Sequence, residues 1–304
     1  MKLKKKSIFH FLVIICSVLF ITIVSLVPIN TTKSGSKWMS QVDDNYNIVD
    51  LSIPGTHDSG ATHSIFDVAG KCQELSIKSQ LNIGVRFLDI RLQLVNDDLN
   101  VVHSFVDQNL KFSKVLKDVT NFINKNPSEF LLISLKEDAS SKSSTDTFEN
   151  VLTSLLKQYE NVICFDSSLP KTLKEARGKI YILSRCNLPY GINAYYNCGD
   201  SSTFTLNDMY IQDNYCIDDV NVKINDIKST IQYSNSTNDK LVINFTSCYL
   251  DYGFPPTYSI PPAKTINKWF NSYIVENDEE ELGIMVMDFI TAKIAKNIYM
   301  RNIV

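Results

Sequence analysis

The sequence is poor in histidine and lacks the paired-cysteine patterns that hold zinc. Only four histidines occur, at positions 10, 57, 63 and 103, and no Cys-x-x-Cys pair is present, so a zinc site is not expected. No basic stripe with interleaved aromatic residues exists, which argues against a nucleic-acid partner. No linker rich in Pro, Gly or Ser and no repeat of fixed period divides the chain, so a single folded domain is predicted.

Residues 1–30 differ from the rest of the chain. Lysines at positions 2, 4, 5 and 6 precede an apolar run from Ile8 to Val27, with no acidic residue in the segment. This pattern predicts export. The run is longer than the ~7 to 15 residues of a usual signal core, matches the ~20 that span a bilayer, and has no Ala-x-Ala site after it. Two alternatives therefore stay open: a removed signal peptide, or a retained N-terminal membrane anchor with the rest outside the cell.

The remainder, residues 31–304, has the composition of a globular domain, because 44% of the whole chain is apolar and 21% is charged. Without the four leader lysines, 26 basic residues stand against 33 acidic ones, a net charge of about −7. Such a surface repels phosphate backbones. Six of the seven cysteines follow the leader and could form up to three disulfides, but their even number does not establish any.

Strand-like and helix-like segments alternate along this domain. The predicted strands are Ile48–Ile53, Val85–Leu94, Leu99–Ser104, Phe130–Lys136, Lys179–Arg185, Met209–Asp213, Leu241–Ser247 and Gly283–Asp288. The predicted helices are Val115–Asn124, Thr147–Tyr159, Val220–Gln232, Lys264–Tyr273 and Lys293–Arg301. The alternation predicts an α/β fold, a TIM-type (β/α)8 barrel. It is expected to be irregular, since the Asn96-Asp97-Asp98 turn leaves no room for a helix.

His57 and His103 each close a strand-like run, and between them lies the charged strand Phe87–Leu92. Two imidazoles near neutral pKa can act as an acid and base pair. The spacing of two in Asp89-x-Arg91 puts both charges on one face of the strand, which predicts that this face lines a cavity. An arginine fork between two histidines suggests a phosphoryl ligand, since its geometry matches two phosphate oxygens.

Other polar residues lie at the ends of predicted strands, where barrel enzymes carry their chemistry: Lys136, Arg185, Asp213 and Asp288. Local patterns alone leave purely structural roles open for these residues. Asp288 could cap the following helix, Lys136 could be a surface lysine, and Asp213 could form a turn before Asn214. His63 is predicted to be a loop residue, and Glu137 and Asp138 to be solvated.

Several short motifs carry a family resemblance in their order along the chain. They are Ile53 to Gly60, Phe87 to Leu92, Val102-His103-Ser104, Ile133-Ser134-Leu135-Lys136, Leu183-Ser184-Arg185, Ile211 to Tyr215, Ile243 to Ser247 and Val286-Met287-Asp288-Phe289. Together they resemble the catalytic X region of the bacterial phosphatidylinositol-specific phospholipases C, over roughly residues 45 to 290. Relatives that need calcium carry a further carboxylate where this chain has Arg91, so the chain is similar to the metal-independent branch, with no cofactor.

The resemblance implies cleavage of phosphatidylinositol to diacylglycerol and a 1,2-cyclic inositol phosphate. It implies that His57 is the base, His103 the acid and Arg91 the stabiliser of phosphoryl charge, with Asp58 on the acid side and Asp288 orienting His57. The residues implied to bind substrate are Asp89, Lys136, Arg185, Asp213 and Tyr215, the last by stacking under the inositol ring.

Two rival functions remain. One is an exported phosphoinositide-binding barrel without turnover, and the other is a glycerophosphodiester phosphodiesterase, against which Arg91 and the absence of a His-Arg-Gly motif argue.

The expected partner is phosphatidylinositol in membranes, contacted peripherally by a monomer. The aromatic segment Cys248–Tyr258, with Tyr195 and Tyr196, could provide this contact, because such rings suit the membrane boundary. Alternatively, this segment covers its own core.

Overall fold

A computed structural model describes residues 35–63, 70–104, 106–186, 188–195, 202–250 and 260–303. The chain divides into two units, residues 1–33 and 34–304, and every described residue belongs to the second. Within these ranges no helix has both the length and the apolar character of a membrane span. The predicted leader, residues 1–30, lies outside the described residues.

The strands form one large sheet and one small one. The large sheet contains β1 (Ile53–Thr56), β2 (Phe87–Val95), β3 (Asp98–His103), β4 (Val106–Lys111), β5 (Leu131–Glu137), β6 (Ile163–Cys164), β7 (Ile180–Ser184), β8 (Ile192–Asn193), β9 (Ser202–Leu206), β10 (Met209–Asp213), β12 (Leu241–Phe245) and β14 (Ile284–Met287). Its main order is β6-β7-β5-β2-β1-β14-β12-β10-β9, and all these neighbours are parallel except β10 and β9. A separate sheet pairs β11 (Cys216–Ile217) with β13 (Tyr249–Leu250).

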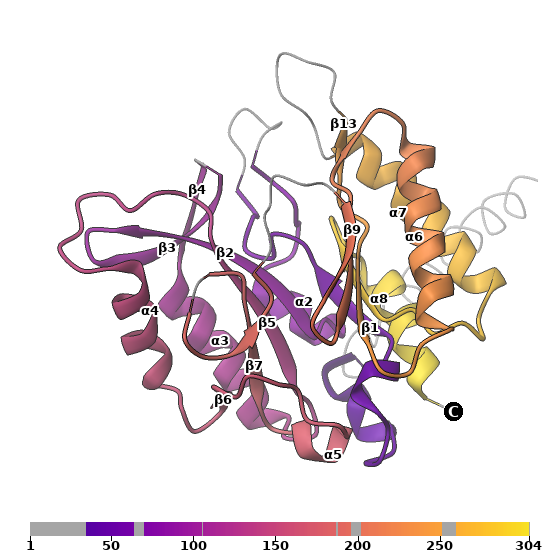
Figure 1. The fold of residues 1–304 in the computed structure, drawn as a ribbon, viewed down its shortest axis with the longest axis horizontal. Coiled ribbons are helices and arrows are strands. Elements are labelled where there is room, and N and C mark those ends of the chain that lie inside the picture. The colour runs from indigo at the N-terminus through magenta and orange to yellow at the C-terminus, as the bar shows by residue number, and fades with distance from the viewer. Residues whose placement is uncertain are drawn as a thin grey trace, which may run out of the picture. The chain divides into compact units, whose positions relative to one another are not determined.

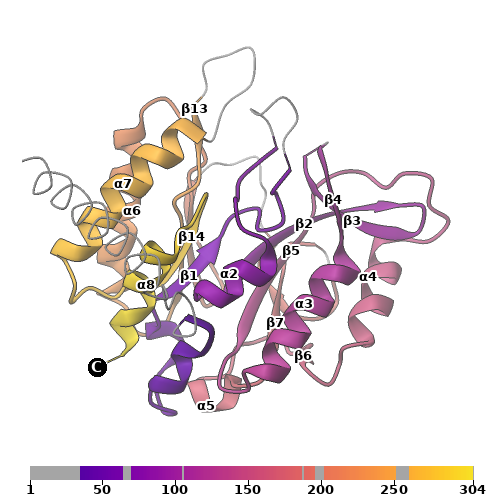
Figure 2. The same ribbon diagram turned by 180° about the vertical axis from the view of Figure 1, so that it is seen from behind.

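Six helices of the described ranges pack against the outer face of the large sheet: α2 (Ile77–Ile83), α3 (Phe112–Lys125), α4 (Phe148–Lys157), α6 (Val220–Ser234), α7 (Ile260–Glu276) and α8 (Ala292–Tyr299). The short helix α5 (Leu173–Ala176) and the 3-10 turns η1 (Gly35–Gln41) and η2 (Ile48–Asp50) instead contribute to the core inside the curled sheet, and the 3-10 turn η3 (Met300–Asn302) follows α8. Figure 1 shows α6 and α7 beside the strands of the C-terminal half, and Figure 2 shows α2 and α3 in front of β2 and β5. Helices on a parallel sheet are what the alternating sequence pattern predicts.

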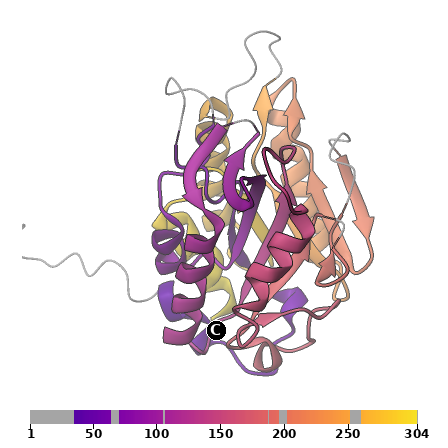
Figure 3. The ribbon, with the colours of Figure 1, turned by 90° about the vertical axis from the view of Figure 1, so that its left-hand side faces the viewer.

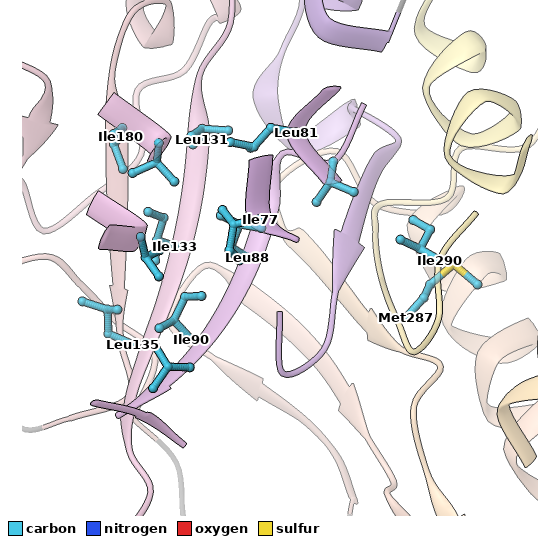
Figure 4. Close-up of a cluster of buried hydrophobic side chains, with 14 of the residues drawn as sticks. Ile77, Leu81, Leu88, Ile90, Leu131, Ile133, Leu135, Ile180, Met287 and Ile290 are labelled. Atoms are coloured by element: carbon cyan, nitrogen blue, oxygen red, sulfur yellow. The ribbon is translucent and has the colours of Figure 1, made fainter. Parts of the chain in front are cut away.

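Successive residues of β2 belong to two different cores, as the period of a strand requires. Leu88 and Ile90 join the core between sheet and helices, together with Ile77 and Leu81 of α2 (Figure 4). Phe87 points the other way, into a second core inside the curled sheet. Because this strand is covered on both faces, Leu88→Ala is expected to cost about 2–5 kcal/mol.

The inner core shows that the sheet curls into a barrel. Tyr181 of β7 and Ile211 of β10 share this core although five strands separate them in the sheet order. Among the described residues no strand pairing joins β9 to β6 or β8, so the barrel stays open on that side. Figure 3 shows the sheet from the side, with the orange strands at its right-hand edge. The prediction of an irregular TIM-type barrel is confirmed.

Two predicted strands are wrong in detail. Residues 48–50 form η2, not a strand, because Ile48 and Leu51 are both buried and the three-residue spacing of a 3-10 turn aims both side chains inward. Residues 98–103 form β3, which pairs antiparallel with β2 through the Asn96-Asp97 turn and lies off the main strand order. It is therefore a hairpin arm and not a barrel strand.

Candidate active site

His57 and Asp288 follow two neighbouring parallel strands. Thr56, the last residue of β1, pairs with Met287, the last residue of β14, so the next residue of each strand leaves the sheet at the same place. The His57 backbone N–H donates to the Met287 carbonyl oxygen at 3.0 Å, which fixes the register one step beyond the sheet. The His57 and Asp288 side chains therefore meet because their strands end together.

The His57 ring is held by a buried carboxylate. Its Nδ1 lies 2.8 Å from Asp288 Oδ1, and the Asp288 side chain is only 1% exposed. Burial disfavours the charged imidazole, but the carboxylates of Asp288 and Asp58 outweigh it, so the pKa of His57 is raised above its ordinary value. Asp288 thus fixes both the orientation of the ring and its readiness to accept a proton.

Asp89 and Arg91 share the inner face of β2, as the spacing predicts. Asp89 is fully buried and ion-pairs with Arg91 at 3.4 Å and with Arg185 at 3.5 Å. Burial alone would raise the pKa of Asp89, but the two guanidinium groups lower it to about 2. Asp89 is therefore a permanent anion between two cations near neutral pH.

The Arg91 guanidinium lies against His57. Its Nη2 is 2.8 Å from His57 Nε2, and its Nε is 3.0 Å from Asp58 Oδ1. Burial opposes the charge, but Asp58, Asp89 and Asp138 outweigh it and raise the pKa of Arg91 well above its ordinary value. Because arginine only donates, His57 Nε2 must accept here, which assigns the His57 proton to Nδ1.

The two predicted catalytic histidines converge on one carboxylate. Asp58 Oδ2 is 3.3 Å from His57 Nε2 and 3.5 Å from Nε2 of His103, which is the last residue of β3. Asp58 has a positive φ of 41°, a conformation that aspartate tolerates better than most residues and that turns its side chain between the rings. Among the described residues, Asp58 Oδ2 and His103 Nδ1 have no hydrogen-bond partner.

Four of the five predicted substrate residues, Asp89, Lys136, Arg185 and Asp213, belong to a charged network beside this centre, whereas the ring of Tyr215 contacts another tyrosine. Arg185 Nη2 lies 3.8 Å from Asp213 Oδ2, and Arg185 also pairs with Asp89, so one guanidinium links β10 to β2. Lys136 Nζ is 2.6 Å from Asp138 Oδ1. The Tyr215 ring lies 5.9 Å from the Tyr249 ring in a tilted arrangement.

One interpretation from the sequence is wrong. Asp138 is not simply solvated: its side chain is 6% exposed and it lies between Lys136 and Arg91, 3.8 Å from Arg91 Nη1. Burial raises its pKa, but Arg91 and Lys136 outweigh that effect and lower it. Glu137 is exposed, as predicted, and so is His63, in a loop. A carboxylate two residues after Lys136 shares its direction along an extended chain, which is the signal that could have found Asp138.

Sequence reasoning also missed Cys72, which is fully buried beside the histidines. Two overlapping groups include its thiol, one with His57 and Asp288 and one with Asp58 and His103. Within each group the candidate ligand atoms lie within 4.8 Å of one another. No motif marks Cys72, because its neighbours in the site are distant in sequence.

The aromatic segment Cys248–Tyr258, which is expected from its sequence to contact the membrane, lies mostly outside the described residues. These include Tyr249 and Leu250 but not residues 251–259. Tyr196 is also outside them, whereas Tyr195 is 58% exposed.

Comparison with known proteins gives one consistent family. Residues 51–186 match the family model described as phosphatidylinositol-specific phospholipase C, X domain. The 1-phosphatidylinositol phosphodiesterase of Listeria monocytogenes is 31% identical over 287 residues, covering 90% of this chain and 87% of that protein. The protein of the same name from Staphylococcus aureus strain Newman is 29% identical, covering 85% of this chain and 89% of the relative.

Solved structures agree with these sequence matches. A phosphatidylinositol-specific phospholipase C from S. aureus, studied for its membrane binding, superposes with a TM-score of 0.78 at 27% identity, over 89% of this chain and 98% of that one. The Listeria enzyme superposes with a TM-score of 0.73 at 26% identity, over 88% and 98% of the two chains.

Proposed function

This chain belongs to the bacterial phosphatidylinositol-specific phospholipase C family, and from that membership we propose that it cleaves phosphatidylinositol to diacylglycerol and 1,2-cyclic inositol phosphate. The observation that carries the proposal is the meeting of two imidazoles at one carboxylate, with Asp58 Oδ2 3.3 Å from His57 and 3.5 Å from His103. An acid and a base that share one small site can serve the two ends of a single phosphoryl transfer.

In the first step His57 acts as the base. Asp288 holds the proton on Nδ1, which leaves the Nε2 lone pair to accept the proton of the inositol 2-hydroxyl. Arg91 Nη2 lies 2.8 Å from His57 Nε2, and the substrate hydroxyl takes its place there. The displaced guanidinium then contacts the phosphoryl oxygens. The 2-oxygen forms a bond to the neighbouring phosphorus, an internal attack that carries a large effective molarity.

In the same step His103 acts as the acid. The bond from phosphorus to the diacylglycerol oxygen breaks, and His103 donates the proton that this oxygen needs. Asp58 accepts a hydrogen bond from the protonated ring, since its free Oδ2 lies 3.5 Å from His103 Nε2. Water then opens the cyclic phosphate slowly, with the two histidines in exchanged roles.

Specificity comes from the charged network beside the histidines. Lys136, Arg185, Asp213 and Asp89 offer donors and acceptors for the inositol hydroxyls, and Tyr215 stacks under the ring. Support comes from Arg185, whose guanidinium already bridges Asp89 and Asp213 at 3.5 and 3.8 Å. A polyol can replace such bridges with hydrogen bonds of its own.

Turnover in this proposal needs no metal. Arg91 supplies a permanent positive charge that can neutralise the phosphoryl oxygens, and its pKa is raised well above the ordinary value, because its carboxylate neighbours outweigh the burial that opposes its charge.

We further propose that the enzyme works outside the cell as a monomer. Residues 31–304 form its catalytic domain, and residues 1–30 direct export, as a removed signal or a retained anchor. Tyr195, with 58% of its surface exposed, and the aromatic segment 248–258 supply a peripheral contact with the membrane.

A phosphorus NMR experiment tests the reaction. Purified protein is incubated with phosphatidylinositol in mixed micelles and, separately, with a glycerophosphodiester that has no inositol. The proposal expects a five-membered cyclic phosphate resonance to build up first and a monoester to follow. Monoester without the cyclic species, or turnover of the second substrate alone, would contradict it, and micelle binding without turnover would indicate a lipid-binding protein.

A further inference from the structure

Cys72 places a thiol at the centre of the catalytic cluster. Its backbone N–H donates to the Ala61 carbonyl at 2.9 Å, and its carbonyl accepts from the Phe289 N–H at 2.8 Å. Both partners lie close in sequence to catalytic positions, so the segments that carry Asp58 and Asp288 are tied to Cys72 itself. The proposed phosphodiester chemistry makes no use of this buried thiol.

We propose that Asp58, Cys72 and His103 form an inhibitory binding site for a thiol-seeking divalent cation such as Zn²⁺ or Cd²⁺. Their candidate ligand atoms lie within 4.8 Å of one another. A thiolate, an imidazole and a carboxylate are all ligands that zinc accepts, and a fourth position would stay open to water.

An unsatisfied atom points to a ligand here independently of the thiol. Asp58 Oδ2 is a buried oxygen with no hydrogen-bond partner among the described residues, on a side chain that is 1% exposed. A buried carboxylate oxygen without a partner is costly, and a cation bound between Asp58, Cys72 and His103 would satisfy it.

Distances favour this group over the one formed by Cys72, His57 and Asp288. Ligand atoms around a tetrahedral zinc lie about 3.3–3.8 Å apart, as bonds of 2.0–2.3 Å require. Asp58 Oδ2 and His103 Nε2 are 3.5 Å apart and share no hydrogen bond. In the other group, His57 Nδ1 and Asp288 Oδ1 are only 2.8 Å apart and already share a proton, so a cation would have to break that bond.

Access and charge also favour the chosen group. The His103 side chain is 26% exposed, so a cation can reach this ring from solvent. Arg91 Nε, 3.0 Å from Asp58 Oδ1, opposes the cation, while Asp89 and Asp138 offset the arginine charge. On binding, the Cys72 thiol loses its proton to water and forms a bond to the metal.

Hard cations should not use this site. Calcium takes six to eight oxygen ligands and magnesium an octahedral set that includes several waters, whereas this group offers one thiol, one imidazole and one carboxylate. Metal occupancy removes His103 and Asp58 from proton transfer, which gives inhibition. The inhibition rests on the proposed function, whereas the binding does not.

Calorimetric titration of the protein with ZnCl₂ and CdCl₂ tests the site directly. One ion should bind per chain, and Cys72→Ser and His103→Gln should each weaken binding by at least about 100-fold, since even outer-shell partners are worth 10–100-fold. Cys164→Ser is the matched control, because the Cys164 thiol donates a hydrogen bond to the Asp166 carboxylate and takes part in neither metal group. Co²⁺ should give a thiolate charge-transfer band in the wild type and not in Cys72→Ser.

Several results would overturn the site. Unchanged zinc affinity in Cys72→Ser would do so, as would weakened binding in His57→Ala with full binding in His103→Gln. Circular dichroism and thermal unfolding check that each variant folds. If the Cys72→Ser variant does not fold, Cys72→Ala takes its place.

An activity assay then tests the consequence. Zinc should inhibit the wild type and Cys164→Ser, EDTA should restore both, and Cys72→Ser should need at least about 100-fold more zinc. Calcium and magnesium at the same concentrations should not inhibit. Absence of binding overturns the metal site and leaves the proposed function standing, whereas binding without inhibition overturns the role given to His103.

Discussion

Replacing Asp288 by asparagine tests how far turnover depends on its bond to His57, because the helix that follows, α8, is capped by Thr291 and not by Asp288. The change keeps the shape of the side chain and removes the charge that accepts from His57 Nδ1 at 2.8 Å. An amide can present its NH₂ group to Nδ1, which forces the proton onto Nε2, where it blocks the base. A comparable loss of orientation and tautomer costs about 10⁴-fold in serine proteases, and general base catalysis contributes about 10²–10⁴-fold. We therefore expect kcat to fall by roughly 10²–10⁴-fold.

The pH dependence separates orientation from simple damage. Burial lowers the pKa of His57, and Asp288 and Asp58 raise it above the ordinary value against that effect. A base must be unprotonated, so activity should rise as pH passes upward through this pKa. Without the Asp288 charge the pKa falls, and the acidic limb of kcat/KM should move to lower pH.

The assay measures kcat/KM for phosphatidylinositol in mixed micelles across pH, with thermal unfolding run in parallel. Asp98→Asn is the matched control, because Asp98 forms an exposed pair with Lys111 at 2.9 Å, and such pairs contribute about 0–1 kcal/mol. It should leave the pH profile unchanged. A profile in Asp288→Asn with the same acidic limb as the wild type, or kcat within threefold of it, would refute the reasoning.

Three further predictions follow from the same geometry. His57→Ala and His103→Ala should each remove at least about 10²-fold of turnover in the phosphorus NMR assay while circular dichroism stays unchanged, and His63→Ala should retain activity because this loop residue is exposed. Asp89, whose pKa is lowered to about 2, should contribute roughly 2 kcal/mol of stability that is present above pH 4 and is lost as pH falls toward 2. Urea unfolding of Asp89→Asn should therefore vary less over that pH range than unfolding of the wild type, and an equal slope would count against the ion pairs. EDTA should leave the activity of metal-free preparations intact, and complete loss that calcium reverses would show that the enzyme needs a metal.

The barrel was predictable because each strand carries its own signal. The alternation of Phe87, Asp89 and Arg91 with Leu88 and Ile90 requires one covered face and one inner charged face, and the structure places them so. The strand boundaries failed where the tertiary context decided them. Ile48–Asp50 turns to bury Ile48 and Leu51 against one core, although Ile48 and Val49 have high strand propensity.

The position of the histidines at strand ends was also visible in the sequence, since small residues after an apolar strand mark its exit. The local pattern did not show which bond each ring makes, although the family resemblance implied that Asp288 orients His57. Asp58 adjoins His57 in the sequence, yet Asp288, more than two hundred residues away, holds its Nδ1, because β1 and β14 are neighbours in the sheet.

Sequence alone determined the fold class, the inward charges of β2 and the set of polar residues at strand ends, because these depend on the local period of the chain. Only the tertiary structure brought Cys72 into the site and placed Asp58 between two imidazoles. Those contacts arise from the order of strands around the barrel and from one residue with positive φ. Neither feature leaves a periodic trace in the chain, because each depends on which distant segments become neighbours.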